Sequence, residues 1–347
     1  MSPVSTPAKS AGESSSSGRP RVGYLGPEGT FTEEALLVSV EPDTVRPVAL
    51  RTIYDTIAAL AHREVEWAIV PIENSLDGSV SATLDLLAAE ESGLQIVGEV
   101  LLSVRHSLIA ASQLALTEIE TVLTHPQVPG QCERFLRGEL GHARVLPASS
   151  TAEAVRIVAR GGQRGQAALG TVLAAQIYGG TVIREGVQDR DDNETRFVWL
   201  ARSKEGAGRA AGDHQPPLRL GGGHGEWKTS LVFWGPGADS PGWLVRCLDE
   251  FGRREINLTK IESRPKRERM GSYMFFVDLQ GQIGDGPVTE AVIGLQEICE
   301  QARVLGCYRA SQSPNEASAG RRRAEKHPAT DCHGESAAPL HSGATDG

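Results

Sequence analysis

The chain has 347 residues, of which 23% are charged and 39% are hydrophobic, and its formal net charge is −9. These values are typical of globular domains with their own cores, and the negative charge argues against a broad nucleic-acid-binding face, which needs clustered basic residues. No run approaches the ~20 apolar residues that cross a bilayer, and the amino-terminal residues contain no signal-peptide core. The five scattered cysteines include no C-x-x-C pair, which favours reduced thiols and a cytoplasmic location.

From the amino end, a tail rich in Ser, Pro and Gly over residues 1–20 is expected to be disordered. Beyond it, short apolar runs alternate with helical spacing up to residue 202. Strands are expected at 22–25, 65–70, 121–123, 144–146, 167–169 and 195–200, with an extended stretch at 94–110. Helices are expected to begin near residues 32, 53, 84, 126, 151 and 171. This alternation predicts an α/β fold with mainly parallel sheets.

The alternating region divides into two α/β lobes. Lobe 1 is expected at about residues 21–100 and 188–202, and lobe 2 at about 101–187. Lobes joined by crossing strands leave a cleft between them, which is a natural site for a small ligand.

The rhythm changes after a linker that is expected at residues 203–227 and is rich in Gly and Pro. Strands are then expected at 228–234, 256–263, 271–279 and 304–309, and helices at 241–253 and 287–303. The resulting βαββαβ order over residues 228–310 predicts a ferredoxin-like unit. A second disordered tail is expected at residues 311–347.

Two polar segments stand out, Pro71–Gly78 and Asn193–Phe197, each next to an apolar strand-like run. Open α/β sheets usually bind ligands where their strands end. Neither segment contains a metal-ligand cluster or a cysteine–histidine pair, so no metal site is expected. A site formed by both segments would use hydroxyl, amide, carboxylate and guanidinium groups.

These segments and several others resemble, in the expected order, the motifs of bacterial prephenate dehydratases. The matching stretches are Gly23–Thr32, Pro71–Gly78, His106–Leu108, His125–Gln127 and Asn193–Phe197. The unit at residues 228–310 is similar to an ACT regulatory domain. The resemblance implies a two-lobed catalytic domain at residues 21–202, like the periplasmic binding proteins. It also implies conversion of prephenate to phenylpyruvate, water and carbon dioxide, with no cofactor, in a homodimer or homotetramer.

The resemblance implies that Thr195 is the catalytic proton donor. The expected substrate-binding set is Thr30, Phe31, Glu73, Asn74, Ser75, Ser150, Thr151, Asn193, Arg196 and Phe197. Structural alternatives stay open for several of these residues. Arg196 lies next to Thr195 on a strand, where alternation would point it to the opposite face, and an ion pair is the alternative role. Glu73 would repel a dianion and could be structural. Thr30, Ser150 and Thr151 could be N-caps, and Phe197 could belong to the core.

The ACT-like unit is expected to bind phenylalanine as a feedback inhibitor. The resemblance implies an effector site of Gly242, Trp243, Leu244, Asn257, Leu258, Glu262, Ser263, Arg264 and Pro265. Trp243 stands where the family usually has a small residue, so its indole either fills part of the effector pocket or points outward. The alternative is a unit that only dimerises. The rival functions are arogenate dehydration and non-catalytic sensing of a small molecule.

Overall fold

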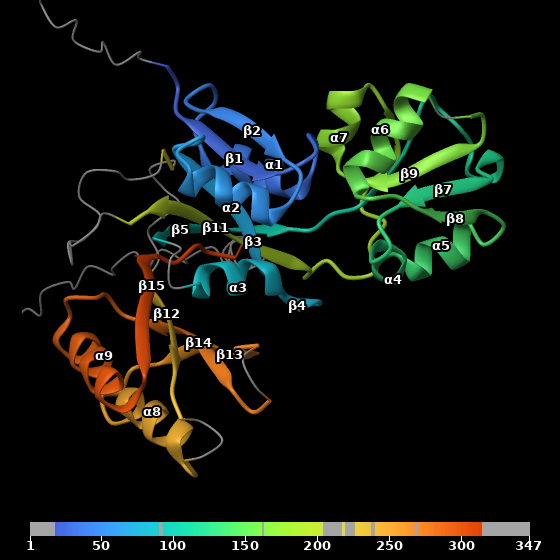
Figure 1. The fold of residues 1–347 in the computed structure, drawn as a ribbon. Helices are drawn as coiled ribbons and strands as arrows, with labels where there is room; N and C mark the ends of the chain where they lie inside the picture. Colours follow the sequence, from blue (N-terminus) through green and yellow to red (C-terminus); the bar gives the residue numbers. More distant parts are fainter. Residues whose placement is uncertain are drawn as a thin grey trace, which may run out of the picture.

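The computed structural model describes residues 18–89, 93–161, 163–203, 217–218, 226–236, 240–267 and 270–313. Most of the expected linker and nearly all of both expected tails lie outside these ranges. The described residues form a ten-stranded sheet and a five-stranded sheet with helices packed against them (Figure 1). This arrangement confirms the α/β prediction.

Lobe 1 contains one side of the ten-stranded sheet. Its strands are β1 (Arg21–Leu25), β2 (Arg46–Leu50), β3 (Trp67–Asn74), β4 (Gly78–Ser79), β5 (Leu94–Ser103) and β11 (Glu194–Arg202), and its helices are α1 (Phe31–Ser39), α2 (Ile53–Ala61) and α3 (Ser81–Ala88). Strands β1, β2 and β3 are parallel, whereas β11 runs antiparallel to both β3 and β5. Apolar side chains on both faces bury this sheet between two core clusters.

Lobe 2 contains the five-stranded sheet, in the order β10-β6-β9-β7-β8. Its strands are β6 (Ser107–Ala110), β7 (Thr121–Thr124), β8 (Arg144–Pro147), β9 (Gln166–Gly170) and β10 (Thr181–Arg184). Its helices are a 3₁₀ turn (Leu116–Glu118), α4 (Val128–Gln131), α5 (Glu133–Glu139), α6 (Thr151–Gly161) and α7 (Val172–Tyr178).

The expectation of mainly parallel sheets is wrong, because both sheets are mixed. In lobe 2, β7 is parallel to β8 and β9, but β6 is antiparallel to β9 and β10. The cause lies in the connections between the lobes. Strands β5 and β11 carry the chain into and out of lobe 2, so they run in opposite directions and pair as neighbours.

The remaining elements form what we call the C-terminal unit, β12 to β15. They are β12 (Trp227–Trp234), α8 (Trp243–Gly252), β13 (Leu258–Pro265), β14 (Tyr273–Gln280), α9 (Gly286–Ile298) and β15 (Gln301–Arg309). Their strands are antiparallel in the order β13-β14-β12-β15. Helices α8 and α9 pack on one face of these strands.

The other face of the C-terminal unit packs against lobe 1 (Figure 1). Val232, Trp234 and Phe276 belong to the same core cluster as lobe 1 residues from α2, α3 and β3. Strand β15 also continues the lobe 1 sheet, since Gly306 pairs with Ile96 of β5. A Cβ atom at position 306 would collide with the Ile96 backbone, so this close approach requires glycine.

Two features are absent from the part of the chain that the structure describes. No helix there combines the length and the hydropathy that a membrane crossing requires. Within the same residues, no group of three or more His, Cys, Asp or Glu side chains is arranged to hold a metal ion.

Candidate active site

The two polar segments identified in the sequence meet where β3 and β11 pair. The antiparallel register places Thr195 opposite Asn74. The side-chain Nδ2 of Asn74 donates to Thr195 Oγ1 at 2.9 Å and to Asn193 Oδ1 at 2.8 Å. Because Thr195 Oγ1 accepts this bond, its own hydrogen remains available for donation to another group.

The turn after β3 holds the Asn74 amide in place. Asn74 Oδ1 accepts the backbone N–H groups of Leu76 and Asp77, each at 2.9 Å. With the carbonyl oxygen fixed by two donors, the amide nitrogen must face β11. The orientation of the Asn74–Thr195 pair is therefore determined by the backbone of the turn.

Ser75 joins the same two segments through backbone and side-chain bonds. Its N–H donates to the carbonyl oxygen of Glu194 at 2.9 Å, and its Oγ accepts the Glu194 N–H at 3.0 Å. Ser75 is exposed, whereas Asn193 is buried. The structure thus brings Asn74, Ser75, Asn193 and Thr195 together in one polar cluster.

Gln131, which the sequence reasoning missed, connects this cluster to lobe 2. It lies at the end of α4, and its Oε1 accepts from Asn193 Nδ2 at 3.3 Å. Its Nε2 donates to the Asp77 carboxylate at 3.2 Å. The nearby His125–Gln127 motif was the available signal, but a glutamine four residues further on has no spacing that marks it.

His106, which directly precedes β6, completes the cluster. Its Nε2 lies 3.0 Å from Gln131 Oε1, and since that oxygen is an acceptor, Nε2 carries the hydrogen. The ring packs edge-on against Phe31 of lobe 1, with centroids 5.5 Å apart. Burial lowers the pKa of His106, and the weaker effect of the Gln131 hydrogen bond does not reverse this. His106 is therefore neutral at pH 7.

A neutral, 1% exposed histidine predicts a specific pH dependence of stability. The unfolded chain protonates His106 near pH 6.5, but the native state resists the charge. The free energy of unfolding should fall as the pH drops below about 6.5, by at most about 1.4 kcal/mol per pH unit from this group. Urea unfolding at pH 7.5 and 5.5 measures it. A His106→Gln variant should lose less stability between the two pH values, and an equal loss would contradict the assignment.

Glu73 and Arg196 lie on the opposite face of the same strands. Arg196 is paired with Glu73 at 3.1 Å, with Glu99 of β5 at 3.3 Å and with Asp278 of β14 at 2.7 Å. Arg196 and Asp278 are buried. Burial alone would raise the pKa of Asp278, but Arg196, the Ser230 hydroxyl and Lys228 hold it below its usual range. These contacts are the ion-pair role that the sequence left as an alternative for Arg196.

Two of the three hydroxyl residues at helix starts, Thr30 and Ser150, act as caps. Thr30 Oγ1 accepts the Glu33 N–H of α1 at 3.4 Å, and Ser150 Oγ accepts the Glu153 N–H of α6 at 3.0 Å. Thr151 is buried at the first position of α6. Capping is the alternative that the sequence left open, and it is compatible with anion binding at the same helix ends.

The carboxyl ends of the parallel strands in both lobes face each other beside the polar cluster. Thr171, which caps α7 after β9, donates to the Gly29 carbonyl oxygen at 2.7 Å. Tyr178 donates to the Glu28 carbonyl oxygen, also at 2.7 Å. The segment Glu28–Thr30 follows β1, so this is the edge where α/β sheets hold ligands.

Phe197, by contrast, is 2% exposed and packs in the lobe 1 core with Trp199 and Leu102.

The expected effector residues are spread over α8 and β13. Trp243 is buried in the core of the C-terminal unit, where its Nε1 donates to the Ile298 carbonyl oxygen at 3.1 Å. Gly242 precedes it at φ +74°, and Leu244 and Leu258 are partly buried against the same core.

The Glu262–Pro265 segment belongs to β13, which faces α3. Arg264 forms hydrogen bonds to both carboxylate oxygens of Asp85, at 3.0 and 3.1 Å, and to Ser81 at 2.7 Å. Glu262 is partly buried, Ser263 and Pro265 are exposed, and Asn257 donates to Gln280 at 2.9 Å. The structure therefore places Arg264 in a contact with lobe 1.

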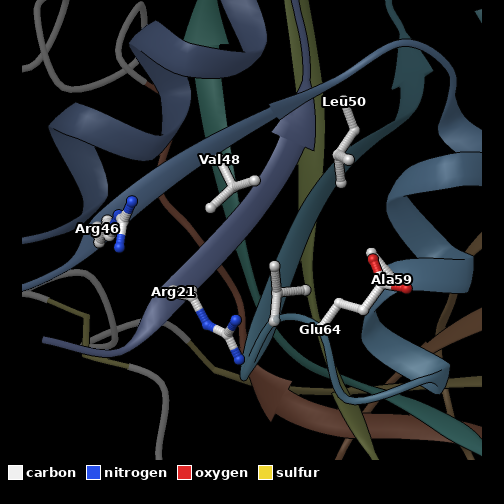
Figure 2. Close-up of a pocket in the computed structure, with 7 residues that line it drawn as sticks. Arg21, Arg46, Val48, Leu50, Ala59 and Glu64 are labelled. Carbon is white, nitrogen blue, oxygen red and sulfur yellow. The ribbon is translucent and has the colours of Figure 1, made fainter. Parts of the chain in front are cut away.

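A cavity of about 390 Å³ lies elsewhere, along β2 and at the amino end of β1 (Figure 2). It is lined by Arg21, Arg46, Val48, Leu50, Ala59, Glu64 and Val65. The polar cluster lies toward the carboxyl ends of the parallel strands, so this cavity is not part of it. The candidate site is therefore defined by the polar cluster and its hydrogen bonds, and not by this cavity.

Comparison with known proteins identifies the family of the chain. The prephenate dehydratase family profile matches residues 22–205. A prephenate dehydratase of Mycolicibacterium vanbaalenii is 38% identical over 302 residues, covering 83% of this chain and 91% of the relative. The structure of a prephenate dehydratase from Arthrobacter aurescens, solved in complex with L-Phe, is 31% identical with a TM-score of 0.71, and the match covers 88% of this chain and 99% of that one.

A further solved structure, described as GqqA, a novel type of quorum-quenching acylase, is 28% identical with a TM-score of 0.71. The match covers 85% of this chain and 99% of that one. A similar fold therefore also occurs in a protein with a different described activity, so the fold alone does not identify the family. The family profile and the 38% identical relative do identify it. The chain belongs to the prephenate dehydratase family of enzymes.

Proposed function

We propose that this enzyme converts prephenate to phenylpyruvate in L-phenylalanine biosynthesis, and that Thr195 protonates the leaving hydroxyl. The observation that carries this proposal is the hydrogen bond from Asn74 Nδ2 to Thr195 Oγ1. An isolated threonine hydroxyl is a very weak acid. A fixed donor on its oxygen stabilises the charge that develops as the proton leaves, and therefore lowers the barrier to donation.

Arg196 is the cation next to Thr195 in the sequence, but its charge is directed away from the Thr195 hydroxyl. Its guanidinium contacts Glu73, Glu99 and Asp278 on the opposite face of the strand. Nearby carboxylates largely cancel the field of a buried cation. The Asn74 dipole, in direct contact with Oγ1, is therefore the group that we propose for this role.

The proposed reaction balances with the residues in place. The bond to the ring carboxylate breaks, and its electron pair enters the ring as aromatic π density. The ring C–O bond breaks at the same time, and the departing hydroxide takes the Thr195 proton to become water. Carbon dioxide and water leave, and Thr195 regains one proton from solvent. Aromatisation drives the reaction, so the enzyme mainly positions the substrate.

We propose that the substrate is held between the lobes. Ser75 and Asn193 can bond its carboxylate or hydroxyl groups without adding charge. The amino ends of α1, at Thr30 and Phe31, and of α6, at Ser150 and Thr151, offer backbone N–H groups to its carboxylates. The helix ends that Thr30 and Ser150 cap would thus also bind the substrate carboxylates. Residues 21–202 form the catalytic domain in this proposal.

The experiment that tests the function compares three substrates on the same purified protein. Prephenate turnover is followed as phenylpyruvate, arogenate turnover as phenylalanine, and an N-acylated amine serves as the acylase substrate. The proposal expects the highest kcat/KM for prephenate. A preference for arogenate would move the function to arogenate dehydration, and tight prephenate binding without carbon dioxide release would indicate a sensor.

For the C-terminal unit, we infer that residues 228–310 form a ferredoxin-like ACT domain that binds phenylalanine in a homodimer or homotetramer. The βαββαβ order of β12 to β15 supports it. So does the Arthrobacter aurescens relative, whose structure contains L-Phe. Trp243 is 2% exposed in the core of the unit, so its indole does not point outward.

Phenylalanine is accordingly expected to lower the initial rate and to raise the melting temperature, because a ligand that binds only the native state stabilises it. Titration with L-phenylalanine at fixed prephenate measures both effects, with D-phenylalanine as the control. An unchanged rate and melting temperature at millimolar L-phenylalanine would favour an ACT unit that only dimerises.

A further inference from the structure

A cluster of buried and partly buried charges joins the β3–β11 strand pair to the C-terminal unit. Lobe 1 contributes Glu73, Glu99 and Arg196, and the C-terminal unit contributes Lys228, Lys260 and Asp278. We call this set the interdomain charge cluster. Opposite charges alternate through it, so each unit supplies the counter-ions of the other.

The contacts on the lobe 1 side converge on β3 and β11. Asp278 contacts Arg196 Nη1 at 2.7 Å, and Lys260 Nζ contacts Glu73 Oε2 at 3.1 Å. The same Glu73 oxygen also contacts Arg196 Nη2 at 3.1 Å. The C-terminal unit therefore holds both members of a cross-strand pair, one on each strand.

Those two residues are the immediate neighbours of the proposed catalytic pair. Arg196 pairs with Glu73 in the register, directly beside Thr195 and Asn74. Side chains alternate along strands, so Thr195 and Asn74 point to one face while Arg196 and Glu73 point to the other. A bulge follows at once, since Phe197 pairs with Pro71 and Ile72 is left over. Pairing resumes at Phe197, so the Arg196–Glu73 pair is the last one before a local irregularity in the β3–β11 ladder.

The C-terminal side of the cluster is itself firmly held. Asp278 Oδ1 accepts from Ser230 Oγ at 2.6 Å, and Ser230 Oγ lies 2.8 Å from the buried Tyr308 hydroxyl. Lys260 makes a second contact with lobe 1, where it donates to Ser79 of β4 at 2.9 Å. Asp278 is thus fixed by its own core and acts as a rigid support for Arg196.

We propose that Asp278 and Lys260 are positioning residues for the dehydration: by holding Arg196 and Glu73 from behind the sheet, they align Thr195 with Asn74 on the front. The C-terminal unit then forms part of the catalytic apparatus, in addition to the regulation inferred above. The kinetic test of this inference rests on the proposed dehydratase activity. Its structural test, by hydrogen exchange, does not require that activity.

The kinetic test uses an Asp278→Asn variant, which keeps the shape of the side chain and removes its charge. We expect kcat for prephenate to fall about tenfold to a hundredfold while KM stays within about threefold, because misalignment affects the reacting groups more than binding. The matched control is Asp85→Asn, which removes a different contact between lobe 1 and the C-terminal unit, the one to Arg264 and Arg267. Asp85 lies on α3 and contacts Arg264 and Arg267 rather than Glu73 or Arg196, so the kcat of this variant should be near the wild-type value.

Two further measurements separate positioning from general stability. In an Arg196→Gln background, Asp278→Asn should reduce the residual kcat by less than about twofold, since residues that act through one another are not additive. Hydrogen exchange at the amides of residues 195–198 should be faster in Asp278→Asn than in Asp85→Asn, and this readout needs no activity. If Asp278→Asn does not fold, Lys260→Met serves for both tests.

Equal kcat values and equal exchange in Asp278→Asn and Asp85→Asn would overturn the proposal. A multiplicative loss in the Arg196→Gln background would also overturn it. Absence of prephenate turnover by the wild-type enzyme would instead refute the proposed function, and the exchange comparison would then decide the positioning role.

Discussion

Thr195→Val should reduce kcat for prephenate by about 100-fold to 10,000-fold, which is the usual contribution of a positioned general acid. Valine has nearly the shape of threonine but no hydroxyl, so the ring hydroxyl would have to leave without a proton donor. The side chain is only partly buried and lies at the end of a paired strand, so the fold should persist. Steady-state kinetics on prephenate, with circular dichroism to check folding, measure the effect.

Thr195→Ser is the matched control for this prediction. It keeps the hydroxyl and therefore the bond that Asn74 donates, which is 2.9 Å long in the structure. Its kcat should remain within about tenfold of the wild-type value, since only a methyl group is removed. Near-normal turnover by the valine variant would eliminate Thr195 as the acid.

The second large effect is expected for Asn74→Asp, with a loss in kcat of about 100-fold or more. The aspartate retains an oxygen for the N–H groups of Leu76 and Asp77, so the turn should be preserved. Where the amide donated to Thr195 Oγ1, however, a carboxylate would accept from it. The Thr195 proton would be directed away from the substrate, and a negative charge would oppose its loss.

Asn74→Ala distinguishes the two contributions of the side chain. It removes the donor without adding charge, so its kcat should lie between those of the wild type and Asn74→Asp. Thermal denaturation of all three proteins tests whether the turn survives. If Asn74→Asp is as active as the wild type, the donor bond to Thr195 has no catalytic role.

The sequence predicted much of the architecture because local patterns carried it. Strands and helices with clear periodicity, such as α6 and β11, appear close to their expected positions. Strand β2 was missed because it is a mostly exposed edge that contains Pro47, which is typical of edge strands and weakens the apolar pattern. Strand β10 was missed for a similar reason, since its four residues are at most partly buried.

The candidate site was predictable only in part. Asn74 and Thr195 belong to motifs and lie at strand ends, and alternation already indicated that Arg196 would face away from Thr195. Gln131 and Asp278 could not be found in this way. They approach the β3–β11 pair through contacts across lobes and domains, at separations of 62 and 82 residues from their partners Asn193 and Arg196. No local pattern encodes such a pairing.

The face of the C-terminal unit also depended on tertiary structure. Its strands contribute to two core clusters, one beneath helices α8 and α9 and one shared with lobe 1. The second face packs on lobe 1, which explains why Lys260, Arg264 and Asp278 point to the catalytic domain. Arg264, which is an expected effector residue, therefore contacts α3 of lobe 1.

The most direct test of the central claim is one side-by-side time course. Purified wild-type enzyme and the Thr195→Val variant are given equal prephenate at neutral pH, with an enzyme-free control, and phenylpyruvate is followed spectroscopically. The wild-type enzyme should form phenylpyruvate rapidly, whereas the variant should stay close to the enzyme-free control. Equal rates of phenylpyruvate formation by the two proteins would contradict the assignment of Thr195 as the proton donor.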